Sequence, residues 1–354
     1  MSPPHFWLRA EAKPLEERRA LSPANAAILV KQGHQVTVER SEQSIFDDQA
    51  YVDAGCTCVA EGSWQRCAPP EAYILGLKEL PEADTALHHR HIYFAHAYKG
   101  QQGWQDILKR FRKGGGELLD LEYLTDHSGR RVAAFGYWAG FAGAAVAIEA
   151  WCAQQNRDSL TNLSSHPNQQ DMVAHLRGCL GVRSPRVMVI GALGRCGHGA
   201  RDVAEQLELE VTAWDCEETQ AGGPFPEILE HDIFINCVFV NHPIPPFLTC
   251  AELKLAGRKL SVICDVSCDP TSNFNPLPIY DSCTDFSDPC LRIIDGQPGL
   301  DLIAIDHLPS LLPAESSHDF SSQLLPSLLE IQNDPNRVWR RARQIFDDKT
   351  KILS

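Results

Sequence analysis

A lysine and a histidine follow two apolar segments that predict neighbouring strands. Lys78 and Glu79 come directly after the run 73–77, and His96 ends the run 91–96. In open α/β sheets ligands bind beyond the carboxyl ends of the strands, so we expect these side chains at one binding edge. A lysine with a lowered pKa can take a proton from a substrate ammonium, and a histidine exchanges protons near neutral pH. This set favours a reaction on a carboxylate-bearing amine.

The same residues also fit a simpler interpretation. A lysine beside a glutamate is most often a solvated ion pair that contributes about 0–1 kcal/mol, and the chain has 14 histidines. Spacing alone leaves both interpretations open, although the agreement of several groups on one sheet edge favours chemistry. Arg18, Arg130 and Arg131 add cations that can bind substrate carboxylates bidentately.

A second chemical signal is a predicted dinucleotide-binding unit that ends at Asp215. An apolar strand over 187–190 is followed by a glycine turn, 191–197, by a helix over 198–207 and by a strand over 210–214. The glycines let the backbone approach a pyrophosphate, and the helix start offers N–H groups and a positive dipole end. The Asp215 carboxylate would bind the adenosine ribose and repel a 2′-phosphate, so NAD is favoured over NADP. The turn is GxxGxxG rather than GxGxxG, and an ordinary tight turn is the alternative.

Alternating strands and helices predict an α/β protein of two doubly wound, Rossmann-like parallel-sheet domains with an active-site cleft between them. We expect residues 1–134 plus 312–354 to form a substrate-binding domain and 135–311 to form an NAD-binding domain. A helix rich in Ala and Gly over 132–153 should lead from the first to the second, and the polar stretch 154–184 is interpreted as a surface excursion.

The expected elements follow apolar periodicity and turn residues. The strands span 5–11, 35–39, 56–60, 73–77, 91–96, 117–124, 187–190, 210–214, 232–238, 260–266 and 302–305. The helices span 23–32 (capped by Ser22), 47–54, 101–112, 132–153, 198–207, 320–331 and 335–347.

Composition limits the class of protein. The 354 residues are enough for two cores, and a net charge of −14 argues against non-specific binding to nucleic acid or anionic membranes. It allows an anionic substrate that meets local cations. The 13 cysteines form no CxxC pair, so we expect reduced thiols and no metal. The N-terminal residues lack the apolar segment of a signal peptide, and the uncharged run 132–148 predicts a buried helix rather than a membrane span.

Eight stretches carry a more specific signal: LRAEAKPLEERRALSP, GLKELPEADT, HIYFAHAYKGQQGWQ, GRRVAAFGYWAGFAGAA, VIGALGRCGHGA, GGPF, DIFINC and IDHLPSLLP. From about Leu8 to about Phe346, the chain resembles the fungal saccharopine dehydrogenases that form L-lysine with NAD. It is more distantly similar to alanine dehydrogenase and to the NAD-binding fold of transhydrogenase. The resemblance implies reversible, NAD-dependent oxidation of saccharopine and hydrolysis of the imine to lysine and 2-oxoglutarate, the last step of the α-aminoadipate route to lysine.

The resemblance also implies a role for individual residues. Lys78 is the base for the secondary amine, and His96 is the acid–base group for imine hydrolysis. Glu79 tunes the pKa of Lys78, and Glu122 tunes the surrounding charge. The implied substrate contacts are Arg18, Lys78, Gln101, Arg131, Phe135, Ser267, Cys268 and Asp269. The implied cofactor contacts are Arg130, Gly194, Arg195, Asp215, Thr219, Phe239, Val266, Ile305, Asp306, His307 and Leu308. Phe239 departs from the family pattern, which often has tyrosine there.

Two further implications concern cysteines and location. In the family a disulfide can join the cysteines that match Cys196 and Cys237, while two reduced thiols are an equal alternative in a reducing compartment. Some members end in a peroxisomal SKL-like signal, which the final residues 351–354, KILS, do not match. We therefore expect a cytoplasmic protein, and a monomer because no coiled coil or exposed apolar stripe is evident.

Two other functions stay open from the sequence. An amino-acid dehydrogenase of the alanine type would use a smaller substrate, and the spread cations Arg18 and Arg131 favour the longer saccharopine instead. A nucleotide-sensing protein without turnover would not need both Lys78 and His96.

Overall fold

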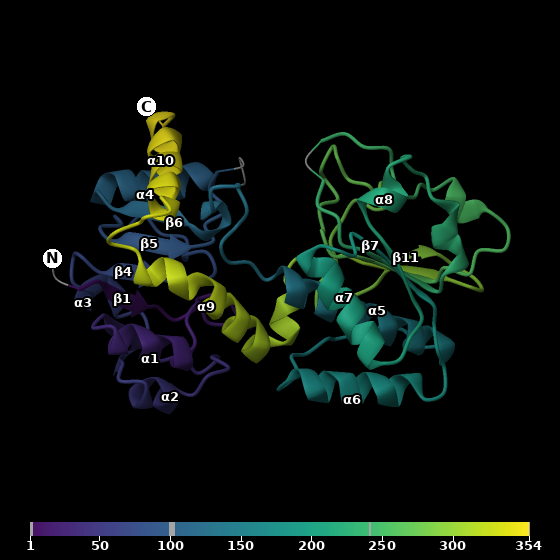
Figure 1. The fold of residues 1–354 in the computed structure, drawn as a ribbon, viewed down its shortest axis with the longest axis horizontal. Helices are drawn as coiled ribbons and strands as arrows, with labels where there is room; N and C mark the ends of the chain where they lie inside the picture. The colour runs from purple at the N-terminus through teal and green to yellow at the C-terminus, as the bar shows by residue number, and fades with distance from the viewer. Residues whose placement is uncertain (1–2, 99–102, 241, 354) are drawn as a thin grey trace. The chain divides into compact units, whose positions relative to one another are not determined.

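The computed structural model describes residues 3–98, 103–240 and 242–353, and the chain divides into two compact units (Figure 1). Unit 1 contains Met1–Ala134 and Ser316–Ser354, and unit 2 contains Phe135–Glu315. Each unit is built on a six-stranded sheet with helices on it. The predicted class, two doubly wound α/β domains, is thereby confirmed, while the expected cleft stays a prediction.

The sheet of unit 1 is parallel throughout, with the strand order β3-β2-β1-β4-β5-β6. The chain starts at a central strand, winds outward to one side and then returns to build the other side. The order therefore reverses between β1 and β4, and such a switch point opens a crevice at the carboxyl ends of the strands. The strands are β1 His5–Leu8, β2 Gln35–Glu39, β3 Thr57–Val59, β4 Tyr73–Leu75, β5 Arg90–Tyr93 and β6 Glu117–Asp120.

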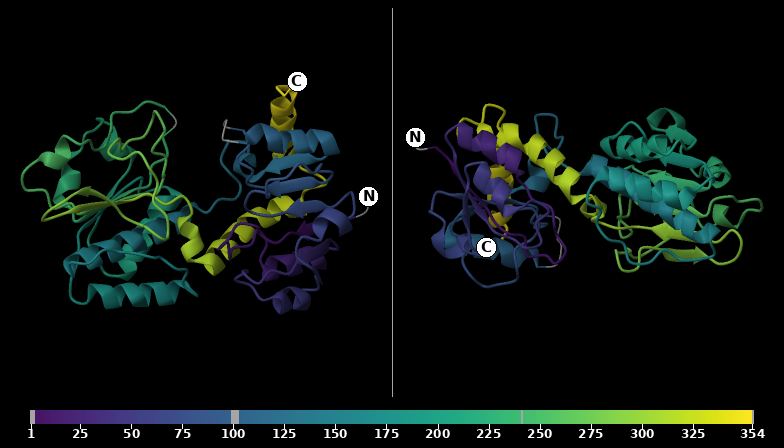
Figure 2. Two further views of the ribbon diagram at one scale, coloured as in Figure 1. Left: turned by 180° about the vertical axis from the view of Figure 1, so that it is seen from behind. Right: turned by 90° about the horizontal axis from the view of Figure 1, so that it is seen from below.

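Helices cover both faces of this sheet, with α4 and α10 on one face and α1 and α2 on the other (Figures 1 and 2). α1 begins as predicted, because the Ser22 hydroxyl accepts the Asn25 N–H at 3.4 Å and Pro23 takes the first position. The short helix α3 was not predicted. The helices are α1 Pro23–Lys31, α2 Asp48–Asp53, α3 Trp64–Cys67, α4 Trp104–Gly114, α9 Pro313–Leu329, which belongs to unit 1 from Ser316 onward, α10 Val338–Lys351, and the 3-10 turn η1 Leu121–Tyr123.

The sheet of unit 2 has the order β11-β12-β10-β9-β7-β8. Its edge strand β11 runs antiparallel to β12, which corrects the expectation of a wholly parallel sheet. The reason is the short loop between the two strands, since a parallel pair needs a crossover of a dozen or more residues. The strands are β7 Val187–Ile190, β8 Val211–Trp214, β9 Ile233–Asn236, β10 Val262–Asp265, β11 Leu291–Ile294 and β12 Leu300–Ile303.

Alternate residues of these strands enter two separate cores. Val187 and Val189 pack with α5, α6 and α7, whereas Met188 and Ile190 pack under loops and 3-10 turns on the opposite face. The helices of unit 2 are α5 Gly136–Gln155, α6 Gln169–Leu180, α7 Arg195–Gln206 and α8 Cys216–Thr219, with 3-10 turns η2 Pro226–Glu230, η3 Glu252–Lys254 and η4 Leu308–Leu311.

The interpretation of 154–184 as a surface excursion was wrong, because this stretch contains α6. Met172, Val173, Leu176 and Leu180 are buried on one side of that helix, at spacings typical of an amphipathic helix. The polar residues between these four positions obscure the helical periodicity in the sequence. Within the described ranges, no helix is long and apolar enough to cross a membrane.

Helices α5 and α7 meet with their backbones in contact. A Cβ on Gly140 would lie 1.8 Å from the Cys196 carbonyl oxygen, and one on Gly199 would lie 1.9 Å from the Tyr137 carbonyl oxygen. No side chain fits at either position. These glycines therefore fix α7, and with it the glycine turn that precedes α7, against the rest of unit 2.

We expect Gly199→Ala to lower the free energy of unfolding by at least about 1–3 kcal/mol, because the methyl group must push α5 and α7 apart. Gly178→Ala is the matched control, since a Cβ on Gly178 in α6 meets nothing within 4 Å. That change should instead stabilise by about 0.5–1 kcal/mol through helix propensity. Urea unfolding of both variants measures the difference. Equal stabilities would contradict the close packing of α5 on α7.

Candidate active site

Lys78 and His96 leave the sheet of unit 1 from adjacent strands. β4 pairs with β1 on one side and with β5 on the other, so residues beyond the ends of all three share one edge. The Phe94 N–H donates to the Leu77 carbonyl at 3.0 Å. This hydrogen bond continues the β4–β5 pairing almost as far as Lys78 and His96. The sheet edge thus supplies an amine and an imidazole from two neighbouring loops.

The backbone turns sharply at His96, where φ is 50°. This left-handed conformation is uncommon for a residue with a side chain. It lowers the stability of the fold by about 1–3 kcal/mol and persists only where surrounding contacts hold it. The turn places the ring between two carboxylates. Its Nε2 lies 3.4 Å from Glu79 Oε1, and its Nδ1 lies 3.9 Å from Glu122 Oε2. Glu79, which was expected to tune Lys78, and Glu122 therefore both face His96.

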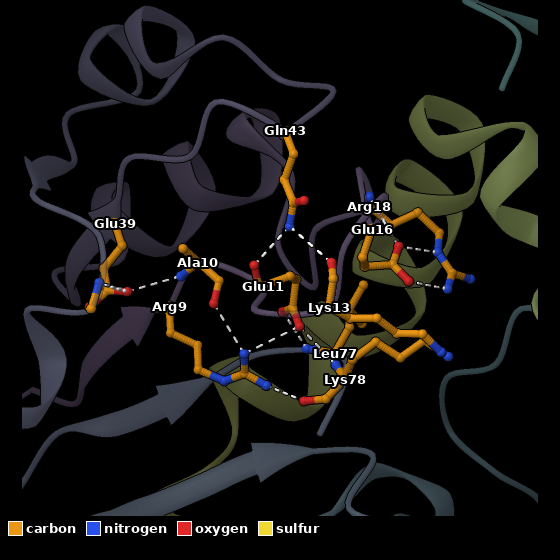
Figure 3. A network of polar contacts seen from close by, with 11 residues as sticks. Arg9, Ala10, Glu11, Lys13, Glu16, Arg18, Glu39, Gln43, Leu77 and Lys78 are labelled. Atoms are coloured by element: carbon orange, nitrogen blue, oxygen red, sulfur yellow. Dashed lines mark hydrogen bonds and ion pairs between the residues drawn. The ribbon is translucent and has the colours of Figure 1, made fainter. Parts of the chain in front are cut away.

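Arg18 is buried and bound by a carboxylate that the sequence did not single out. Its Nε and Nη2 donate to the two oxygens of Glu16, each at 2.7 Å (Figure 3). Burial would raise the pKa of the Glu16 carboxyl, but the charge and hydrogen bonds of Arg18, with the nearby Lys78 charge, hold that pKa below its usual range. Glu16 is therefore an electrostatic neighbour of Lys78, and the fork of Arg18 already holds one carboxylate.

The other predicted cations of unit 1 lie in an exposed turn. The Asp126 carboxylate stabilises the turn by accepting the backbone N–H groups of Ser128 and Arg130. The backbones of Thr125 and Arg131 form an isolated antiparallel β-bridge across it. Arg130 and Arg131 are exposed there. The predicted contact Gln101 lies outside the described residues.

In unit 2 a pocket of about 480 Å³ opens at the carboxyl ends of β7, β8 and β9. Gly191 has φ +86°, and a Cβ there would lie 2.9 Å from the Cys237 carbonyl carbon. Gly197 approaches the same turn so closely that a Cβ would lie 2.2 Å from the Gly191 oxygen. Only a chain without side chains at these positions forms this cradle. The pocket is lined by Ile190, Gly191, Gly194, Asp215, Cys216, Thr219, Gln220, Gly222, Cys237, Val238, Phe239, Val240, His242, Ile244, Pro245 and Phe247.

Asp215 anchors this pocket. Its carboxylate accepts the Leu193 N–H at 2.8 Å and the Cys216 N–H at 2.9 Å, and Thr219 donates its hydroxyl to the Asp215 carbonyl at 2.7 Å. Burial would raise the pKa of the carboxyl, but these N–H donors hold it below its usual range. A charged carboxylate beside a glycine cradle and the start of α7, where Arg195 is the first helical residue, fits the ribose and pyrophosphate of NAD.

The remaining predicted cofactor residues differ in exposure. Phe239 lines the pocket and is 69% exposed, so its ring is available to a ligand. Ile305 and Leu308 are each 1% exposed and belong to the core, where Leu308 and Val266 pack beside Gly143. Between them, Asp306 is exposed and the His307 ring lies 4.2 Å from that of Phe286.

The loop after β10 is organised by Asp265, a fully buried residue that the sequence did not single out. Its carboxylate accepts the Ser267 hydroxyl at 2.6 Å, the Asn236 amide at 2.9 Å and the Tyr280 hydroxyl at 2.7 Å. Cys268 follows with φ 48°, and its Sγ lies 3.3 Å from that of Cys283. Asp269 is exposed at the loop tip, and Phe135, the other implied contact in unit 2, precedes α5.

All thirteen cysteines fall within the described ranges, and each is a free thiol. Cys196 and Cys237 are hydrogen-bonded neighbours, and burial together with this contact raises the pKa of Cys237 well above its usual value. A disulfide between these two cysteines stays a prediction from the resemblance. In the part of the chain that the structure describes, no group of three or more His, Cys, Asp or Glu side chains is placed to hold a metal ion.

Comparison with known proteins connects these features. Residues 7–142 match the family model for the N-terminal domain of alanine dehydrogenase/PNT. The chain is 48% identical over all of its length to saccharopine dehydrogenase (NAD(+), L-lysine-forming) of Schizosaccharomyces pombe, which is also covered entirely. Its counterpart in Yarrowia lipolytica is 49% identical, with 98% of this chain and 97% of the relative covered.

Solved structures show the same fold. An L-alanine dehydrogenase superposes with a TM-score of 0.67 at 16% identity, over 99% of this chain and 100% of that chain. A transhydrogenase from Sinorhizobium meliloti gives a TM-score of 0.62 at 16% identity, over 91% of each chain.

Proposed function

The chain belongs to the family of NAD-dependent, L-lysine-forming saccharopine dehydrogenases, and from this premise we propose how its residues carry out the reaction. The enzyme oxidatively deaminates L-saccharopine to L-lysine and 2-oxoglutarate with NAD, and the reaction is reversible. The observation that carries this function is the identity of nearly half of all residues with such enzymes over the full chain. The amine and imidazole at one edge of the unit 1 sheet supply the proton transfers that the reaction needs.

Lys78 acts first, as the base for the secondary amine of saccharopine. A protonated amine has no lone pair to drive loss of a hydride from the neighbouring carbon, so its proton must leave before oxidation. NAD, when bound, accepts that hydride. Glu16 supports this role because its negative charge lies near Lys78 and stabilises the ammonium that forms when Lys78 takes the proton.

His96 acts in the second stage, when water adds to the imine and the carbinolamine breaks down. It takes a proton from the attacking water and returns one to the departing amine of lysine. Glu79 and Glu122 face its two ring nitrogens and orient the ring for both transfers. The same two carboxylates stabilise the imidazolium between the transfers.

The other assignments follow the resemblance and chemistry of each residue. Arg18, Gln101, Arg131, Phe135 and the 267–269 loop hold the substrate, whose carboxylates require cations. Gly194, Arg195, Asp215, Thr219, Phe239 and Val266, with Arg130 and the 305–308 segment, hold NAD. For Ile305 and Leu308 the contact is made by backbone, because their side chains lie in the core. A monomeric, cytoplasmic enzyme stays our prediction from the sequence.

We expect Asp215→Ser to change the choice of cofactor. Loss of a hydrogen bond to a charged group costs about 1.5–3 kcal/mol, so kcat/KM for NAD should fall about 10–100-fold. That for NADP should rise, because the charge that repels its 2′-phosphate is gone. Glu217→Gln is the matched control, because it removes one charge from an exposed position in the adjoining helix α8. An unchanged ratio of NAD to NADP activity in Asp215→Ser would contradict the assignment.

Substrate choice tests the function itself. Purified protein with NAD should form NADH with saccharopine and not with alanine or glutamate. Turnover on alanine would favour the alanine-dehydrogenase alternative, and NAD binding without turnover on any of the three would favour a sensor.

A further inference from the structure

Two charged side chains are buried at the carboxyl end of β1, beside the end of β4 (Figure 3). Arg9 is 2% exposed and Glu11 is 3% exposed, and the Arg9 Nη1 lies 3.2 Å from Glu11 Oε2. Taking both charges out of water costs free energy that their attraction often fails to repay, so stability is a weak reason for such a pair. Their other contacts indicate a different role.

The pair holds the backbone of the loop that carries Lys78. The Glu11 carboxylate accepts the Leu77 N–H at 2.7 Å and the Lys78 N–H at 2.9 Å. The Arg9 guanidinium donates through Nη2 to the Lys78 carbonyl. The N–H and the carbonyl of Lys78 belong to the two rigid peptide planes on either side of its Cα, so holding both fixes φ and ψ. The direction in which the lysine side chain leaves the backbone is thereby fixed.

Gly76 makes room for this arrangement. A Cβ on Gly76 would lie 2.5 Å from Arg9 Nε and 2.7 Å from its Nη2. The Arg9 backbone N–H also donates to the Leu75 carbonyl at 2.9 Å, and the guanidinium carbon lies 5.6 Å from the centroid of the Tyr93 ring. The guanidinium is thus enclosed between β4 and β5 and cannot move away without loss of these contacts.

We propose that Arg9 and Glu11 are positioning residues that hold Lys78 where it can take the substrate proton. The inference rests on the proposed role of Lys78 as the base. The two residues lie at the reversal of strand order between β1 and β4, so they connect the two strand ends that border the crevice. Proton transfer requires hydrogen-bond reach between the two atoms, and a shift of about 1 Å can lower a rate about 10²-fold.

The test measures Glu11→Gln in the wild-type and Lys78→Met backgrounds by single-turnover NADH formation, with saccharopine limiting and with folded enzyme and NAD in saturating excess. Under these conditions the rate constant does not depend on the fraction of enzyme that is folded. We expect a loss of about 10–100-fold in the wild-type background. In the Lys78→Met background we expect Glu11→Gln to lower the rate constant by less than about threefold, because no base remains to be positioned.

Equal losses in the two backgrounds, or no loss in the wild-type background, would overturn the proposal. A Lys78→Met enzyme that reacts at the wild-type rate would refute the proposed base itself, a result that is independent of Glu11. If Glu11→Gln gives no folded protein, Arg9→Lys replaces it, since lysine keeps the buried charge but cannot span Glu11 and the Lys78 carbonyl. The same unequal losses are expected for Arg9→Lys, and equal losses overturn the proposal.

Glu39→Gln is the matched control within unit 1. Glu39 is 1% exposed, and its carboxylate accepts N–H groups from Trp7, Ala10, Gly62 and Trp64 but none from the Lys78 loop. This variant should unfold at a lower temperature, while its single-turnover rate stays within about threefold of the wild type. A loss as large as that of Glu11→Gln would show that any buried charge in this network has the same effect, against a specific role for Arg9 and Glu11.

Discussion

Replacing Lys78 with methionine is expected to lower kcat for saccharopine oxidation by about 10²–10⁴-fold, the usual contribution of a general base. Methionine keeps much of the length of the side chain but cannot take a proton. Only the small fraction of substrate whose amine has already lost its proton then reacts. The residual rate should therefore rise about tenfold per pH unit until the amine itself is deprotonated. Initial rates across a pH series measure both effects.

Lys109→Met is the control for this variant. Lys109 is an exposed lysine of α4 in the same unit, paired with Asp106 at 2.9 Å. Its replacement removes the same charge from the protein and should leave kcat and the pH profile unchanged. A Lys78→Met enzyme with full activity, or with a lowered rate that does not respond to pH, would contradict the role of Lys78 as the base.

Replacing His96 with glutamine is expected to lower the steady-state rate of lysine formation by about 10²–10³-fold, because imine hydrolysis loses its acid–base group. Glutamine keeps a polar, neutral side chain of similar length at this position, so the local structure should survive. The reverse reaction from lysine and 2-oxoglutarate must fall equally, since the same proton transfers then form the imine. Assays in both directions measure this.

His175→Gln is the matched control, because its ring Nε2 pairs with Glu149 at 2.9 Å in unit 2, far along the chain from the catalytic loops. It repeats the chemical change at another histidine–carboxylate pair and should leave both rates unchanged. A large loss in only one direction for His96→Gln would contradict a shared hydrolysis step.

Most of the fold could be predicted because the strands are apolar and the turns carry glycine. The strand over 187–190 and the helix start at Ser22 match the structure at the residue level. The missed elements lack those signals. α6 spreads four buried residues among polar ones, and β11 has only partly buried or exposed residues at a sheet edge. The pattern of apolar residues is easy to recognise in a strand that is buried on both faces. It is weak in edge strands and in half-exposed helices.

The candidate site was predictable only in part. Lys78 and His96 follow recognisable strands, so their shared edge can be inferred from the topology. Glu11 and Glu16 have no such signal, because in the charged stretch 11–19 they resemble ordinary surface residues. Glu11 reaches its partners at Leu77 and Lys78 only after β1 and β4 pair, and that contact depends on the folded sheet.

The central claim is that two residues serve two successive stages, with Lys78 acting before hydride loss and His96 after it. Rapid mixing of each enzyme with saturating saccharopine and NAD, with NADH followed by absorbance, tests this most directly. His96→Gln should form close to one NADH per active site at nearly the wild-type rate and then slow abruptly, because oxidation is intact and hydrolysis is not. Lys78→Met should show no fast phase. A fast phase in Lys78→Met, or its loss in folded His96→Gln, would contradict the assignment of the two stages.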